Sequence, residues 1–255
     1  MCLTQIATMD GFIKFMNQSQ GRDRLFRATQ YACMLLSYML ENKAGREKVI
    51  MKLKRVESNM SSGRKLFRLG NFIHAIEASK AAIQLSDSAL CYCLTAANLN
   101  RVLYFTCDSV LWAISVGLVS DINKITWRLR ATRCYFYSLL FHLARDVYII
   151  RRCMKEEVKG SKHNGKDSGC DKEPDHNHSN SILKILENIV TIFYLSLRHN
   201  PPVLLDTIKN VCDLLSPLDR LGVYQTSQGF VGICGLVSSI IGIVTVAQPV
   251  LKLKS

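Results

Sequence analysis

The feature that most constrains this chain is an uncharged apolar stretch near its C-terminus, GFVGICGLVSSIIGIVTVA, at residues 229–247. No charged residue occurs between Arg220 and Lys252. A helix of this length is about 28 Å long, close to the roughly 30 Å hydrocarbon thickness of a bilayer. A helix in a soluble core usually keeps one polar stripe, and this stretch lacks one. It therefore predicts a transmembrane helix over 229–248, with a buried core helix as the alternative.

The rest of the chain has helical hydrophobic spacing and little strand alternation, so we expect an all-α helical membrane protein with amphipathic cytosolic helices. A stretch over 157–181 with almost no apolar residue reads as a flexible polar linker. The remaining expected segments are a basic N-terminal cytosolic region over 1–90, a candidate first span over 91–113, helical regions over 114–156 and 182–228, and a short basic tail over 249–255.

The charge is strongly positive and unevenly placed. The formal net charge is +13, and the excess lies within the first 155 residues. A basic surface favours an anionic partner, and no nucleic-acid-binding motif accompanies the charge, so lipid headgroups are the better expectation. The ten cysteines form no C-x-x-C pair, which favours a reducing compartment over a disulfide framework.

No catalytic or nucleotide-binding motif is present, and we expect neither an enzyme nor a cofactor. The residue types that could bind a metal, Cys170, His176 and His178, lie in the polar linker without a scaffold, so no metal site is expected.

The most informative polar segment is SSGRKLFRLGNFIHAIEASKAAIQL at 61–85. As one helix it places Leu66 and Phe72 on an apolar face and Arg64 and Arg68 on the opposite face. Such a helix can lie in a membrane interface, but an ordinary bundle helix with a solvated basic face has the same pattern. The pattern alone leaves both open.

A second span over 91–113 is an open question for a different reason. The surrounding segment is apolar, but Arg101 and Asp108 interrupt it. Each charge costs about 2.5–3.5 kcal/mol at the centre of a membrane on insertion scales. The alternative is a bundle helix lying at the membrane surface.

The C-terminal stretch also carries small residues four apart, Gly235 with Ser239 and Ser238 with Gly242. Small residues let membrane helices approach closely, so these four predict a face for self-association, although glycine is common in such helices generally. Two lysines, Lys252 and Lys254, follow the stretch and favour a cytosolic C-terminus.

Several collinear blocks together resemble the peroxisomal membrane protein 11 family, most closely its alpha subtype. The blocks that carry the resemblance are NQSQGRDRLFRATQYACMLL (17–36), SSGRKLFRLGN (61–71), LNRVLYFTCDSVLW (99–112), LARDVYII (143–150), HNPPVLLDTIKNVCDLLSPLDRLG (199–222) and GLVSSIIGIVTVA (235–247).

The resemblance implies a protein of the peroxisomal membrane that elongates the organelle and promotes its proliferation and division. In this family an amphipathic helix is thought to insert into one leaflet and generate curvature. Carried over to the matching positions, contact with headgroups falls on Arg64, Lys65 and Arg68, and insertion falls on Leu66, Leu69, Phe72 and Ile73.

The resemblance also implies a topology and partners. Two spans with both termini cytosolic are implied, with self-association and association with related family members. The implied partners are anionic phospholipid, the peroxisomal membrane-protein import receptor and the adaptor that recruits the division machinery. Coat-protein binding through a C-terminal dilysine signal stays open, because Lys252 and Lys254 stand fourth and second from the end, whereas the usual signal needs a lysine in third place.

Two rival functions remain beside membrane remodelling. One is a channel-like passage for small metabolites, with Asn98, Asn100, Arg101 and Asp108 as candidate lining. The other is an adaptor scaffold that 229–247 merely anchors.

Overall fold

The computed structural model describes residues 9–41, 43, 45–120, 122–164, 200–251 and 253, and these residues are helical without any strand. The predicted all-α class is therefore confirmed for them. The helices are α1 (Met9–Asn17), α2 (Ser19–Leu40), α3 (Glu47–Phe67), α4 (Asn71–Ile83), α5 (Ser88–Ser115), α6 (Lys124–Asn164), α8 (Pro201–Arg220) and α9 (Gln228–Ala247), followed by the short 3₁₀ helix η2 (Pro249–Leu251).

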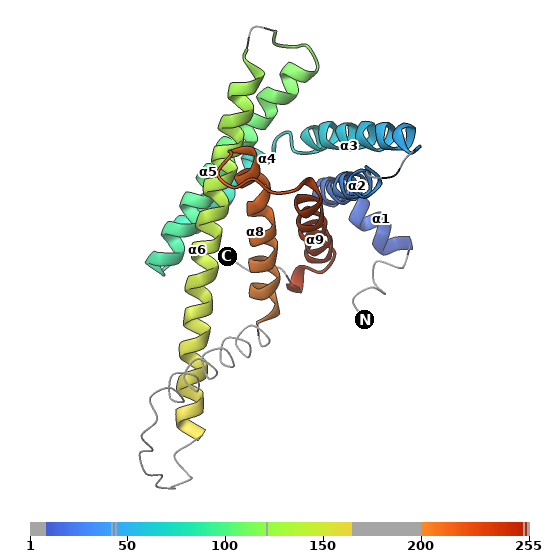
Figure 1. The fold of residues 1–255 in the computed structure, drawn as a ribbon. Helices are drawn as coiled ribbons and strands as arrows, with labels where there is room; N and C mark the ends of the chain where they lie inside the picture. The colour runs from blue at the N-terminus through green and yellow to red at the C-terminus, as the bar shows by residue number, and fades with distance from the viewer. Residues whose placement is uncertain are drawn as a thin grey trace.

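Six of these helices form a closed ring. Going round it, α2 packs against α9, α9 against α8, α8 against α6, α6 against α5, α5 against α3, and α3 against α2. Helix α4 packs against α5. Figure 1 shows the long α6 beside α5 and α8, α9 on the other side of α8, and α3 lying above α2. The centre of this ring is where the candidate site lies.

The helix ends follow familiar sequence signals. Asp87 caps α5, because its carboxylate accepts hydrogen bonds from the backbone N–H groups of Ala89 and Leu90 at 3.0 and 3.3 Å. Ser227 caps α9 by accepting a hydrogen bond from the backbone N–H of Phe230 at 3.3 Å. Helix α8 begins at Pro201, a position where the missing N–H costs nothing.

The expected single helix over 61–85 is wrong. Helix α3 ends at Phe67, and α4 begins at Asn71 after a turn in which Gly70 has φ 81°. Glycine reaches this left-handed conformation at little cost and is a common helix terminator. The segment is therefore divided between two helices, and its first residue, Ser61, lies inside α3.

The predicted C-terminal span corresponds to α9, with bounds one residue away at each end. Among the described residues, α9 is the only helix long and apolar enough to cross a membrane. Helix α5, which contains the candidate first span over 91–113, does not meet that measure. The expected linker over 157–181 also begins too early, because α6 continues to Asn164. The remainder of the linker, the part of the next helical region up to residue 199, and both lysines of the tail lie outside the described residues.

The glycine face of α9 packs against α2 within the same chain. A Cβ placed on Gly235 would come within 2.4 Å of the Tyr31 ring, and one on Gly229 within 2.5 Å of the Tyr38 ring. Near the other end of the contact, Gly242 faces Arg24, so the two helices run antiparallel. Small residues thus bring the two helices together, as the sequence suggests, but within one molecule.

The residues predicted for self-association are therefore already packed against α2 of the same chain. Ser238 and Ser239 are fully buried, and Gly235 and Gly242 are buried as well. The sequence pattern recognises that a helix must approach here, but it does not say which helix. In this fold the partner is α2, so the assignment of self-association to these four residues is corrected.

We expect Gly235→Ala to lower the free energy of unfolding by about 1–3 kcal/mol, because the added methyl overlaps the buried Tyr31 ring. Gly232→Ala is the matched control, since a Cβ there would lie 3.4 Å from Leu35, an ordinary contact. Unfolding of the two purified variants in detergent by denaturant measures the difference. Equal stability of the two variants would contradict this packing of α2 on α9.

Candidate functional site

The ring of helices encloses a polar cavity of about 1460 Å³. Twelve lysine and arginine side chains line it against six aspartates and glutamates. The charged lining residues are Asp23, Arg24, Arg27, Lys54, Glu57, Arg64, Lys65, Arg68, Arg101, Asp108, Lys124, Arg128, Arg145, Asp206, Lys209, Asp213, Asp219 and Arg220. Buried charges are costly unless they are paired, so their partners decide what the cavity can do.

The first cluster joins four helices at Asp213 of α8. The guanidinium of Arg27, from α2, donates to both carboxylate oxygens of Asp213, and both side chains are buried. Tyr135 of α6 donates its hydroxyl to the same carboxylate at 3.2 Å, and Ser238 of α9 also donates to it. Burial alone would raise the pKa of Asp213, but the Arg27 charge and these hydrogen bonds outweigh burial and lower it.

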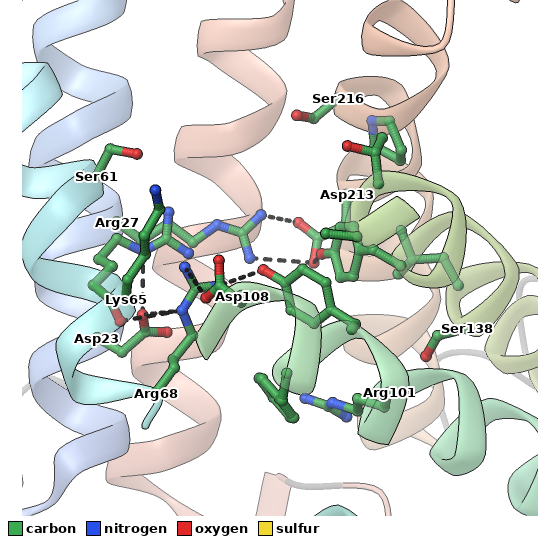
Figure 2. Close-up of a pocket in the computed structure, with 18 of the residues that line it drawn as sticks. Asp23, Arg27, Ser61, Lys65, Arg68, Arg101, Asp108, Ser138, Asp213 and Ser216 are labelled. Carbon is green, nitrogen blue, oxygen red and sulfur yellow. Dashed lines mark hydrogen bonds and ion pairs between the residues drawn. The ribbon is translucent and has the colours of Figure 1, made fainter. Parts of the chain in front are cut away.

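The second cluster joins α2, α3 and α5 where the ring closes (Figure 2). Asp23 of α2 lies 3.2 Å from the Arg64 Nε and 3.6 Å from the Arg68 Nε. Arg68 also lies 3.1 Å from Asp108 of α5 and donates to the hydroxyl of Tyr104. Burial would raise the pKa of Asp23, but the charges of Arg64 and Arg68 lower it instead. The two arginines thus hold α3 to its neighbours.

The third cluster joins α6 to α8. Arg145 of α6 donates to Asp206 of α8 and, at 3.0 Å, to its own neighbour Asp146. Asn210 donates to Asp146 at 2.8 Å, and Lys209 donates to Asp206. Asp206 and Lys209, three residues apart on α8, are both largely buried at the cavity.

The outside of the ring is apolar where the inside is charged. On α9 the exposed side chains Phe230, Ile233, Val237 and Ile240 recur three and four residues apart and so follow one outward face. Only 33% of the most apolar part of this helix is buried. Helices α5 and α6 also expose large apolar residues, namely Tyr92, Leu99, Leu103, Tyr137, Leu140 and Val147. A bundle with these faces suits contact with lipid better than contact with water.

The predicted membrane-surface residues divide into two groups. The apolar residues Leu66 and Ile73 are exposed by 51% and 52%, and Phe72 is exposed as well, whereas Leu69 is only partly exposed. Arg64 and Arg68, by contrast, have side chains only 12% exposed and point into the ion pairs described above. Lys65 lines the cavity. In this structure the arginines do not face a membrane surface, so their assignment to headgroups is corrected.

Other cations face outward, although none of them was assigned to the membrane surface from the sequence. Lys48, Lys52 and Arg55 of α3 and Lys80 of α4 are exposed, alongside the exposed apolar residues Val49, Met51, Val56 and Ile76. Helices α3 and α4 have no close backbone contact with each other, and each exposes both basic and apolar side chains.

No group of three or more metal-binding side chains occurs within the described part of the chain. The linker residues Cys170, His176 and His178 lie outside it. No disulfide joins any two of the eight described cysteines.

A helical bundle with a charged interior, an apolar exterior and one helix fit to cross a bilayer defines a helical membrane protein. The family model of peroxisomal biogenesis factor 11 (PEX11) matches residues 9–247. Peroxisomal membrane protein 11A of Homo sapiens is 52% identical, covering 97% of this chain and 100% of its own length. Peroxisomal membrane protein 11B of Homo sapiens is 40% identical, over 96% of this chain and 100% of its own.

A more distant relative, the peroxisomal membrane protein 11 homolog of Dictyostelium discoideum, is 24% identical over 92% of both chains. No solved structure matches the chain. The chain belongs to the peroxisomal biogenesis factor 11 family, and the predicted resemblance is confirmed. This membership places it among the proteins of the peroxisomal membrane, in a family of biogenesis factors.

We expect Asp213→Leu to destabilise the protein by about 3–5 kcal/mol, because it leaves the buried Arg27 charge without its partner. The double variant Arg27→Met/Asp213→Leu should cost less than Asp213→Leu alone, since it removes both charges together. Unfolding in detergent, followed by circular dichroism, measures both. If the loss of stability in the double variant equals the summed losses in Asp213→Leu and Arg27→Met, the two residues are not coupled.

Proposed function

We propose that this chain promotes elongation and division of peroxisomes by laying the outer surface of α3 and α4 into one leaflet of the peroxisomal membrane. Family membership supports the organelle and the broad process. The observation that carries the mechanism is the joint exposure of apolar and basic side chains on α3 and α4, with Ile73 and Lys52 as representatives.

The mechanism follows from the two kinds of exposed residue. The apolar side chains enter the headgroup and acyl boundary, as those of an interfacial helix do. Each exposed lysine or arginine near an anionic surface adds about 1 kcal/mol of attraction. Inserted side chains expand one leaflet relative to the other, so curvature increases with the local density of the protein. Helix α9 keeps the protein in the bilayer, which raises that density.

Self-association would raise the density further. Because α2 covers the glycine face of α9, a second copy would have to contact an outward face, such as that of Ile233 and Val237. Association with the import receptor, the division-machinery adaptor and coat proteins, and cytosolic placement of both termini, remain predictions from the family resemblance.

We expect Ile73→Gln/Ile76→Gln to abolish peroxisome elongation while the protein still reaches peroxisomes, since both side chains are exposed and no buried contact is lost. The measurement is live imaging of the tagged full-length chain beside a peroxisomal matrix marker, with organelle length and number recorded. The matched control is Val223→Gln/Tyr224→Gln, which changes two exposed apolar residues between α8 and α9.

Normal elongation with the first variant would overturn the proposed surface. Loss of elongation with both variants would show a general effect of surface polarity. Charge reversal at Arg64 or Arg68 would be a poor test, because it also breaks the buried contacts that hold α3 in the ring.

The cavity supports a second candidate function, the passage of small metabolites. Three of the four residues expected to line a path, Asn98, Arg101 and Asp108, do line the cavity. Asn100 instead donates its side-chain amide to the backbone carbonyl of Ala96 at 2.9 Å.

If the cavity conducts, the purified chain in a planar bilayer should carry a current that Arg101→Glu changes in ion selectivity, because that variant inverts a charge of the lining. Absence of current from protein whose insertion is verified would remove this candidate. That result would leave the remodelling proposal untouched.

A further inference from the structure

We propose that the cavity holds a binding site for a dianionic phosphate group, built around Arg24 of α2 and Arg101 of α5. The inference depends on neither the remodelling nor the passage of metabolites, because a bound anion could equally be a ligand or a structural component.

Several cations of the lining, among them Lys65, Arg128 and Arg220, have no carboxylate partner among the described residues; Arg24 and Arg101 belong to this group, and their charges act on each other. Both line the cavity, and neither takes part in any hydrogen bond or ion pair within the described part of the chain. Arg101 lies over the Phe105 ring, with its guanidinium carbon 5.8 Å from the ring centroid. In Figure 2 its guanidinium has no dashed line, unlike those of Arg27 and Arg68.

The two arginines also act on each other unfavourably. Burial and the charge of Arg24 together lower the pKa of Arg101. The Arg24 charge also opposes that of Lys209, whose pKa is lowered first by burial. Like charges held together in a partly buried place are destabilising unless an anion lies among them.

The carboxylates nearby are already in use. Asp206 accepts from both Arg145 and Lys209, and Asp146 accepts from Arg145 and Asn210. These two carboxylates therefore balance the charges of Arg145 and Lys209. Arg24 and Arg101 have no such carboxylate in the described part of the chain, and their two positive charges match one dianion.

His142 gives an independent indication of a missing ligand. It lines the same cavity from α6, and both of its ring nitrogens are buried without any hydrogen-bond partner. Burial and the charges of Arg101 and Arg145 lower the pKa of His142, so the ring is neutral at physiological pH. A neutral imidazole can donate one N–H to an oxyanion, which would satisfy a group that is otherwise costly to bury.

The fold also makes room for one of the two arginines. The Arg24 Cδ lies 3.0 Å from the place where a Cβ on Gly242 of α9 would stand. Any larger residue at 242 would force the Arg24 side chain to move. Guanidinium groups bind phosphate through two parallel N–H···O hydrogen bonds, so the pair suits a phosphate better than a halide.

The phosphate group could belong to a lipid headgroup or to a small soluble phosphate. Both sources present the same dianion to the two arginines. The experiments below first test the site and then separate the sources.

The first experiment titrates the purified full-length chain, in a neutral detergent, with inorganic phosphate at constant ionic strength set by sodium chloride. We expect the midpoint of thermal unfolding to rise and then saturate, because a ligand that binds only the folded state stabilises it. A midpoint that does not change with phosphate overturns the proposal.

The variant Arg24→Gln/Arg101→Gln should bind phosphate at least tenfold more weakly. Its matched control is Arg133→Gln/Arg151→Gln, which removes two charges from exposed positions within α6. An equal loss in both variants would indicate diffuse attraction and overturn the site. Without phosphate, the first variant should unfold at the same or a higher temperature than the unchanged chain, because repulsion is relieved.

A second variant, Arg101→Lys, tests the same site if the first variant fails to fold. It keeps the charge but loses the two parallel donors, so phosphate binding should weaken while the fold is retained. Unchanged affinity in Arg101→Lys would contradict direct contact of Arg101 with the anion.

A last experiment distinguishes a lipid headgroup from a soluble phosphate. It adds phosphatidic acid to the detergent micelles, with phosphatidylcholine as the control lipid. Competition between phosphatidic acid and inorganic phosphate would assign the site to a lipid headgroup. Undiminished phosphate binding in its presence would assign the site to a soluble phosphate. Neither readout involves organelle shape, so failure here is distinct from failure of the remodelling proposal.

Discussion

The ion pair between Arg27 and Asp213 is the interaction on which the ring of helices depends most. Their helices, α2 and α8, have no close backbone contact, so these side chains reach across the interior. The same carboxylate also accepts from Tyr135 and Ser238, which brings α6 and α9 to one point. A charge at the centre is tolerated because α2, α6 and α9 each contribute a donor to it.

This arrangement inverts the usual distribution of polarity. In a water-soluble bundle the apolar stripes face each other and the charges face solvent. Here arginines and aspartates face each other, while residues such as Ile233 and Leu103 face outward. The inversion explains how Arg101 and Asp108 can interrupt an otherwise apolar segment: both line the cavity rather than the outer surface of α5.

The sequence revealed what is local and missed what is distant. The uncharged run of α9 is a property of neighbouring residues, so its bounds could be predicted closely. Arg64 and Arg68 seemed to face solvent because their partner Asp23 lies about forty residues earlier, and no helical periodicity records such a pairing. Gly70 is different, because a helix-terminating glycine is recognisable in the sequence. The strong helical periodicity on both sides of it nevertheless favoured one continuous helix.

The antiparallel contact of α2 with α9 joins residues near the start of the chain to residues near its end. A ribosome adds about 5–20 residues per second, so many seconds pass between the synthesis of α2 and that of α9. During that time Arg27 has no Asp213, 186 residues further on, to neutralise it. Formation of the ring is therefore a late event that only a finished chain can complete, and a prematurely terminated chain would carry an unshielded row of arginines that quality control could recognise.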